Sequence, residues 1–147
     1  MLFEELVHGF TYSGHPVAAA VALKNLEVME KHALVPRVKQ TIGPYLQRRL
    51  RETLQSHPLV GEVRGIGMLA AIELVEDKGT RKPALGLGGK VVAEAGKRGL
   101  IMRQRGGADG PPASGDSLCL APPLMTPEAT LDRIVQIVGE SIEAAMG

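Results

Sequence analysis

The sequence predicts a small α/β domain in which helices pack on one face of a three- to four-stranded, largely antiparallel sheet. The chain of 147 residues has the size of one ordinary domain, and 44% of its residues are hydrophobic, enough to form a core. Apolar residues recur with helical spacing in several segments, and short apolar runs bounded by turn residues lie between them. Because the chain has no Trp, two Tyr and two Phe, the core is expected to be aliphatic.

Two helices are expected in the first part of the chain. The first spans Pro16–Lys31 and is apolar almost all round near its start, which suits a helix buried between domains. The second runs from about Pro36 to Gln55, where apolar residues recur every fourth position: Val38, Ile42, Leu46, Leu50 and Leu54. Gly43-Pro44 interrupts this stripe and should kink the helix, because proline removes a backbone hydrogen bond.

A pair of strands and a short helix are expected next. The strands cover about Val60–Arg64 and Met68–Val75, joined by a turn at Gly65–Gly67. The second strand is mostly apolar, as expected for a well-covered strand. The helix covers about Gly88–Arg98, and Gly99 is expected to end it.

The last part of the chain is expected to hold two more strands and a helix. The strands cover Leu100–Gln104 and Ser117–Leu120. Between them, Arg105–Asp116 is too rich in Gly and Pro to hold regular structure. Thr126 is predicted to cap the last helix, with Pro127 in its first turn and an apolar face of Leu131, Ile134, Val135, Val138 and Ile142.

Composition argues against several classes of function. A net charge of +1 carries no signature of polyanion binding, so nucleic acid is not an expected partner. The single cysteine, Cys119, excludes an internal disulfide and is expected to be a buried strand thiol. The four histidines show no helical metal-ligand pairing, so no metal is expected. No run of about 18 apolar residues and no basic signal-like start occur, so no membrane partner is expected and the default location is cytoplasmic.

The stretch from His8 to Pro16 has the features of a phosphate-holding turn in front of a helix. Gly9 and Gly14 let the backbone come close to a ligand, and three consecutive hydroxyls offer donors: Thr11, Tyr12 and Ser13. The helix start directs free N–H groups and the positive end of its dipole at the turn. The same residues also fit a Gly-rich loop that leads into a helix and binds no ligand.

Four segments together resemble one enzyme family. They are residues 8–29 (HGFTYSGHPVAAAVALKNLEVM), 60–69 (VGEVRGIGML), 99–103 (GLIMR) and 120–128 (LAPPLMTPE). In this order they are similar to segments of the class III pyridoxal-phosphate-dependent aminotransferases, of the ω-transaminase or amine–pyruvate type. The likeness begins at the family's late phosphate-contacting turn, runs to its C-terminus and covers nearly the whole chain.

The resemblance implies an organisation and a cofactor. Residues 34–147 would form the small C-terminal α/β domain of a fold-type I enzyme. Residues 1–33 would supply the phosphate-contacting turn and a bridging helix from the end of the large domain. The cofactor would be pyridoxal 5′-phosphate, and Thr11, with Phe10 beside it, would reach the cofactor phosphate in the other subunit of a homodimer. The alternative for Thr11 is that it merely caps its own turn.

The resemblance also implies a reaction and a substrate-binding residue. The complete enzyme would move an amino group between an amine or amino acid and a keto acid such as pyruvate. Arg103 matches the family's arginine that swings in to bind a substrate carboxylate. Arg105, two residues on, could take this role if the strand register shifts, and an arginine solvated at a strand end is the alternative for Arg103.

The family's large domain has no counterpart in this sequence, so no catalytic residue is expected in this chain. The missing part carries the lysine that binds the cofactor covalently, the acidic residue at the pyridine nitrogen and the aromatic that stacks on the ring. The lysines of this chain lie in polar contexts expected at the surface: Lys24, Lys31, Lys39, Lys78, Lys82, Lys90 and Lys97. The chain alone is therefore expected to be inactive. The alternatives are a non-catalytic oligomerisation or regulatory module, a truncated pseudoenzyme, or part of an aminomutase or decarboxylase of the same fold.

Overall fold

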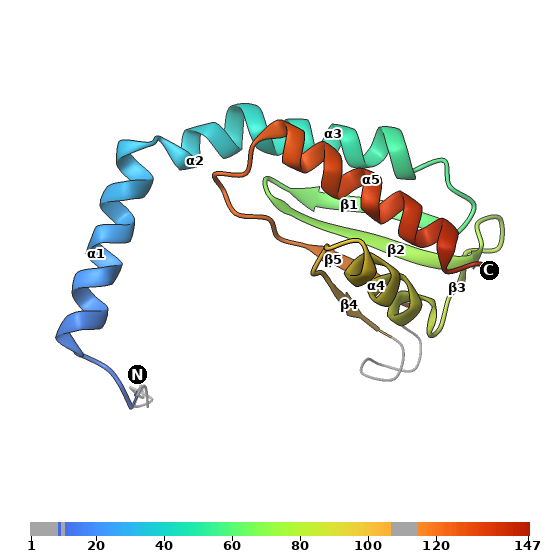
Figure 1. Cartoon of the computed structure of the whole chain (residues 1–147), viewed down its shortest axis with the longest axis horizontal. Coiled ribbons are helices and arrows are strands. Elements are labelled where there is room, and N and C mark those ends of the chain that lie inside the picture. Colours follow the sequence, from blue (N-terminus) through green and yellow to red (C-terminus); the bar gives the residue numbers. More distant parts are fainter. Residues whose placement is uncertain (1–8, 10, 107–114) are drawn as a thin grey trace, which may run out of the picture. The chain divides into compact units, whose positions relative to one another are not determined.

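The computed structural model describes residue 9, residues 11–106 and residues 115–147. The chain divides into two compact units, the first ending at Leu34 and the second spanning Val35–Gly147 (Figure 1). None of the described helices is long and apolar enough to cross a lipid bilayer.

The first unit consists of a turn at residues 11–14 followed by helix α1 (Pro16–Lys31), with the bounds that the sequence predicts. His15 is the N-cap residue, and its Nδ1 accepts a long hydrogen bond of 3.4 Å from the N–H of Ala18. Pro16 fills the first helical position, where a missing N–H costs nothing. No residue of α1 is buried, so its apolar side chains are available to another surface.

The second unit is built on a five-stranded antiparallel sheet, which confirms the predicted fold class. Strands β1 (Val60–Ile66), β2 (Leu69–Asp77), β5 (Ser117–Leu120) and β4 (Arg103–Arg105) lie in this order, and β3 (Lys82–Pro83) pairs with β2. The fifth strand, β3, is absent from the prediction because two residues are too few to show a pattern. Strand β4 begins at Arg103 rather than Leu100, since its pairing with β5 starts at Arg103–Cys119.

The core lies between the sheet and the helices α3 (Gly43–Leu54), α4 (Leu87–Lys97) and α5 (Glu128–Ala144) (Figure 1). Helix α3 contacts β1, α4 contacts β4 and β5, and α5 contacts both α3 and α4. In the central row across the sheet, Val63, Ile72 and Leu118 are buried. The predicted stripe of the second helix is buried too, at Ile42, Leu46, Leu50 and Leu54. The alternate strand residues point to the opposite face of the sheet.

The predicted helix from Pro36 to Gln55 is divided into three parts. Helix α2 (Leu34–Arg37) is followed by a π-helical segment, η1 (Val38–Ile42), and then by α3. The N–H of Gly43 donates to the carbonyl of Val38, so the irregularity lies just before Pro44, where proline cannot continue the α-helical pattern. A Cβ on Gly43 would lie 2.8 Å from the Cα of Gly67, so the helix touches the β1–β2 turn there.

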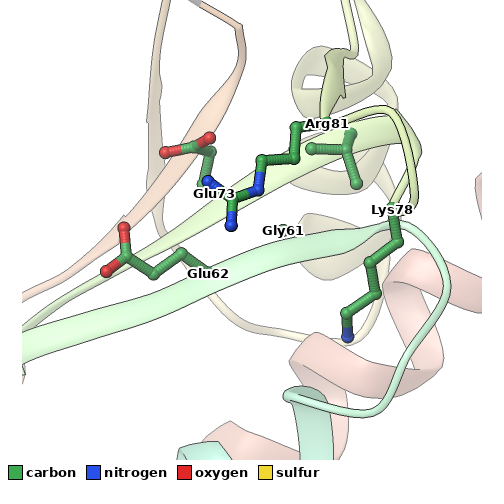
Figure 2. Close-up of a pocket in the computed structure, with 6 residues that line it drawn as sticks. Gly61, Glu62, Glu73, Lys78 and Arg81 are labelled. Carbon is green, nitrogen blue, oxygen red and sulfur yellow. The ribbon is translucent and has the colours of Figure 1, made fainter.

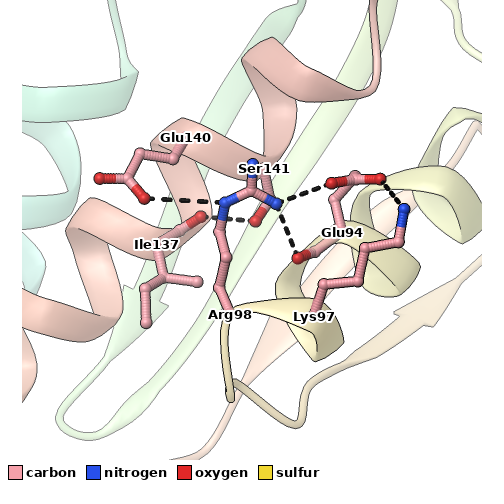
Figure 3. A network of polar contacts seen from close by, with 6 residues as sticks. All are labelled: Glu94, Lys97, Arg98, Ile137, Glu140 and Ser141. Carbon is pink, nitrogen blue, oxygen red and sulfur yellow. Dashed lines mark hydrogen bonds and ion pairs between the residues drawn. The ribbon is translucent and has the colours of Figure 1, made fainter.

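Polar contacts fix α5 to the two other long helices. Asp132 of α5 accepts hydrogen bonds of 2.8 Å from Arg49 Nε and from the Tyr45 hydroxyl, both on α3. These bonds, first from Arg49 and then from Tyr45, lower the pKa of the Asp132 carboxyl. On the other side, Arg98 at the end of α4 lies 3.7 Å from Glu140 of α5 (Figure 3).

The predicted cap of the last helix is wrong. Pro127 is the N-cap residue of α5, and the hydroxyl of Thr126 instead donates to the carbonyl of Pro123 at 2.7 Å. The reason is that Thr126 is buried in the turn before the helix, where its hydroxyl needs a nearby acceptor.

Candidate functional site

The turn before α1 presents Thr11 to solvent. Thr11 is exposed, its turn closes with a 3.3 Å hydrogen bond from the His15 N–H to the Tyr12 carbonyl, and Gly14 adopts a φ of +75°. The exposed Thr11 thus lies shortly before Pro16, the first residue of α1. A phosphate fits such a turn, because a hydroxyl and free N–H groups converge on its oxygens. Phe10 lies outside the described residues.

Arg103 lies in β4, directly opposite Cys119 of β5, and Arg105 lies opposite Ser117. Both arginines are exposed, whereas Gln104 between them is opposite the buried Leu118. Because side chains alternate along a strand, both guanidinium groups are on the face of the sheet away from the helices. Arg103 and Arg105 therefore lie two residues apart on this same face.

This outer face carries two rows of side chains across the sheet. One row runs Arg64, Ala71, Cys119, Arg103, and the next runs Glu62, Glu73, Ser117, Arg105. Arg64 pairs with both acids, at 2.9 Å from Glu73 and 3.3 Å from Glu62. No ion pair joins Arg103 or Arg105 to another residue that the structure describes. Among the described residues, Arg64 thus pairs with the carboxylates of Glu62 and Glu73, and both β4 arginines are exposed.

The prediction that Cys119 is a buried thiol is wrong. Cys119 is partly exposed because it belongs to the outer row, and its buried neighbours Leu118 and Leu120 face the core instead. Apolar residues on both sides of a cysteine do not reveal which face of the sheet it occupies.

A cavity of about 430 Å³ lies near the start of β1 and the end of β2, and Glu62 and Glu73 are among the residues that line it (Figure 2). Figure 2 shows the residues that line it, which are two acids, two bases and two small residues: Gly61, Glu62, Glu73, Val75, Lys78 and Arg81. Its charges balance, so it offers no clear preference for an anion or a cation. Among the described residues no cluster of His, Cys, Asp and Glu could hold a metal ion.

All seven lysines are exposed, as the sequence predicts. An amine at the surface keeps its proton at neutral pH and is a poor nucleophile, whereas a lysine that forms an imine needs a site that lowers its pKa. The described residues therefore supply an exposed turn before a helix and two exposed arginines on one strand, but no lysine in a setting suited to imine chemistry.

The chain belongs to the family described as aminotransferase class-III, whose family model matches residues 1–142. It is 42% identical over 141 residues to the putrescine–pyruvate aminotransferase of Pseudomonas aeruginosa, covering 95% of this chain and 29% of that protein. It is also 40% identical over 131 residues to the diaminobutyrate–2-oxoglutarate transaminase of Halomonas elongata, covering 87% of this chain and 26% of that protein.

Solved structures agree with the family and the fold. An aminotransferase from Bacillus anthracis superposes with a TM-score of 0.84 at 34% identity, over 98% of this chain and 32% of that one. A thermostable ω-transaminase variant from Pseudomonas jessenii gives a TM-score of 0.79 at 40% identity, over 95% and 29% of the two chains. The chain thus spans less than a third of the length of these relatives, and its sheet-and-helix unit is consistent with the small domain of a fold-type I enzyme.

Two features of this region were not apparent in the sequence. The acids at positions 62 and 73 are charged residues on separate strands, and only the observed pairing brings both to Arg64. Gly106 and Gly115 meet at the base of the β4–β5 connection, where a Cβ on Gly106 would clash with the Gly115 carbonyl. The only sign of this close approach in the sequence is that a glycine stands at each end of the loop.

Proposed function

We propose that this chain is the C-terminal part of a pyridoxal-phosphate-dependent transaminase that moves an amino group between an amine or amino acid and a keto acid such as pyruvate. The family match over residues 1–142 carries the proposal, and the exposed positions of Thr11 and Arg103 support it. When bound, pyridoxal phosphate supplies an electron sink for the carbon that exchanges its amino group. The enzyme would be a homodimer located in the cytoplasm, a compartment in which the thiol of Cys119 stays reduced.

Thr11 is proposed to bind the cofactor phosphate of the partner subunit, with Phe10 beside it in the same turn. The exposed hydroxyl and the helix that starts at Pro16 support this role, since both favour a phosphate dianion. Residues 1–33 would then belong to the end of the large domain and residues 34–147 to the small domain.

Arg103 is proposed to bind the carboxylate of the keto acid or amino acid. A guanidinium is always charged and pairs with a carboxylate through two parallel hydrogen bonds. Its position at the start of β4 fixes its backbone, while its long side chain, free of described ion pairs, can move toward or away from a substrate.

The chain alone should have no transaminase activity, because each of its lysines is exposed. Purified chain mixed with pyridoxal phosphate and then borohydride should show no labelling of one particular lysine and no turnover of an amine donor. One labelled lysine together with turnover would contradict the proposal. The DNA sequence upstream of Met1 distinguishes the enzyme hypothesis from that of a non-catalytic module. An in-frame coding region that contains a cofactor lysine would support only the enzyme.

A hybrid enzyme tests the role of Thr11. In it, residues 1–142 replace the matching segment of the Pseudomonas aeruginosa putrescine–pyruvate aminotransferase. The hybrid should bind pyridoxal phosphate, and Thr11→Ala should weaken cofactor binding by about tenfold or more, the loss expected for a charge-assisted hydrogen bond. Tyr12→Phe, which removes a neighbouring exposed hydroxyl, is the matched control and should change cofactor affinity little. Equal effects of both substitutions on cofactor affinity would contradict the assignment of Thr11 to the phosphate site.

A further inference from the structure

Arg103 and Arg105 form an adjacent pair of cations on one strand. They are alternate residues of β4, so about 7 Å of strand separates their Cα atoms and both side chains leave the same face. Each guanidinium stands on a long flexible stem, so the two heads can lie closer together or farther apart than their Cα atoms. A small molecule with two carboxylates on a short carbon chain matches this spacing.

Arg105 lies next to the point where the two ends of the β4–β5 connection come close together. Gly106, next to Arg105, has a φ of +105° and approaches the Gly115 carbonyl so closely that a side chain would clash. Arg105 pairs with Ser117 immediately inside this contact. The pairing with β5 thus places both arginines on one face of the sheet.

The neighbouring charges leave this arginine pair without a described counterion. Glu73, in the same row as Arg105, is two strands away, about 10 Å across the sheet, and accepts a 2.9 Å hydrogen bond from Arg64. Glu62, the other acid of that row, also lies against Arg64. Two exposed guanidinium groups side by side repel each other, and a dianion relieves this repulsion better than a monoanion.

We propose that Arg105 is a specificity-determining residue that binds a second carboxylate, so that Arg103 and Arg105 together favour a dicarboxylate keto acid as the amino acceptor. This inference rests on the proposed role of Arg103 in carboxylate binding. Pyruvate, with one carboxylate, would use Arg103 alone. A dicarboxylate keto acid would place the carboxylate next to its keto group on Arg103 and its distal carboxylate on Arg105.

The test is a binding titration of the 147-residue chain at constant ionic strength. The probes are 2-oxoglutarate and glutarate, with two carboxylates, and pyruvate and acetate, with one. Binding is followed by the Nε–Hε NMR signals of the arginines, assigned with the variants Arg103→Gln and Arg105→Gln. Thermal unfolding with the same probes gives the same comparison if the labelled chain associates. Arg133→Gln, an exposed arginine of α5, is the matched control for loss of one positive charge.

The expected result is that the dicarboxylates bind about fivefold more tightly than the monocarboxylates, the ratio that about 1 kcal/mol from one further exposed ion pair gives. Arg105→Gln should remove this preference while leaving pyruvate binding unchanged, and Arg133→Gln should leave the preference intact. Equal binding of both probe classes, or a preference that survives Arg105→Gln, would overturn the inference while leaving the role of Arg103 standing. Pyruvate binding that is unaffected by Arg103→Gln would instead contradict the role of Arg103 and, with it, this inference.

Discussion

At the scale of single residues, Asp116 shows how one buried side chain organises the unit. Asp116 is 1% exposed, and its Oδ2 accepts a 2.7 Å hydrogen bond from the N–H of Gly88 in the first turn of α4. Its own N–H donates to the Ala84 carbonyl. The carboxylate thus binds the first turn of a helix through Gly88, 28 residues earlier in the chain. Asp116 directly precedes β5, the strand that pairs with Arg103 and Arg105.

Replacing Asp116 should therefore destabilise the fold. Asp116→Ala leaves the Gly88 N–H without its acceptor and should lower the free energy of unfolding by about 1–2 kcal/mol. Asp116→Asn keeps an acceptor oxygen at the same place and should lose less. Urea denaturation of the three proteins measures this, and an alanine variant as stable as the parent would show that the cap contributes nothing.

At the scale of elements, α4 and α5 are joined by a small charged network (Figure 3). Arg98 at the end of α4 donates to both the carboxylate and the backbone carbonyl of Glu94, and Lys97 also donates to the Glu94 carboxylate. These contacts, that of Lys97 first and that of Arg98 second, lower the pKa of Glu94. Figure 3 shows Arg98 reaching between Glu94 and Glu140, so the network spans both helices.

The pH dependence of stability should report this network. Because folding lowers the pKa of Glu94, its ionised form stabilises the fold above the carboxyl's unfolded pKa, about 4.3, and this contribution is lost as the pH falls through the folded value. Glu94→Gln should lower the Tm at pH 7 by about 2–4 °C. The difference from the parent should shrink as the pH falls below about 4.3 and through the lowered pKa of folded Glu94.

The matched control for this prediction is Glu30→Gln, which removes one exposed carboxylate from α1. Its Tm difference from the parent should stay small at every pH. A Glu94→Gln difference that is the same at pH 7 and in acid would mean that the ionised carboxylate does not stabilise the α4–α5 contact.

How much of these elements the sequence could predict depends on how local their causes are. The helix over Pro16–Lys31 and the apolar stripe of Leu46, Leu50 and Leu54 follow from composition and spacing, and both are found. The outward position of Cys119 depends on a strand far along the chain, because Cys119 pairs with Ala71 of β2. The bond of the Thr126 hydroxyl and the two-residue strand β3 are local, but each is too short to leave a pattern in the sequence.

In the candidate site, too, some features follow from the sequence and others require the structure. Thr11 and Arg103 come from motifs, and the structure leaves their binding roles as proposals. That Arg105 shares the face of Arg103 follows from alternation along the strand once β4 is recognised. The pairing of Arg64 with Glu62 and Glu73 required the tertiary structure.

At the scale of the whole molecule, the exposed apolar residues of α1 indicate a surface made for contact. None of its residues is buried, and Val17 and Val21, one turn apart, are each 64% exposed. A helix of this length is marginal in water unless another surface covers its apolar side. Contiguous exposed apolar residues also favour self-association.

The 147-residue chain should therefore associate in solution. Light scattering at increasing concentration should show species larger than the monomer, and the double substitution Val17→Ser and Val21→Ser should reduce them. Substituting two exposed polar residues of the same helix, Lys24→Ser and Glu27→Ser, is the control and should not. A monodisperse monomer at high concentration would show that α1 does not drive association.

The central claim is that this chain contributes a carboxylate-binding arginine to a class III aminotransferase, and transamination by the hybrid enzyme with Arg103→Ala tests it most directly. In the hybrid, pyruvate carries a carboxylate and putrescine does not. We expect Arg103→Ala to raise the KM for pyruvate by an amount equivalent to about 2–5 kcal/mol if the pair is desolvated, because the carboxylate is left without its partner. The single-turnover reaction with putrescine should be nearly unchanged, and the Arg133→Gln control should alter neither. Equal losses with both substrates, or a loss that appears only with Arg105→Ala, would contradict the claim.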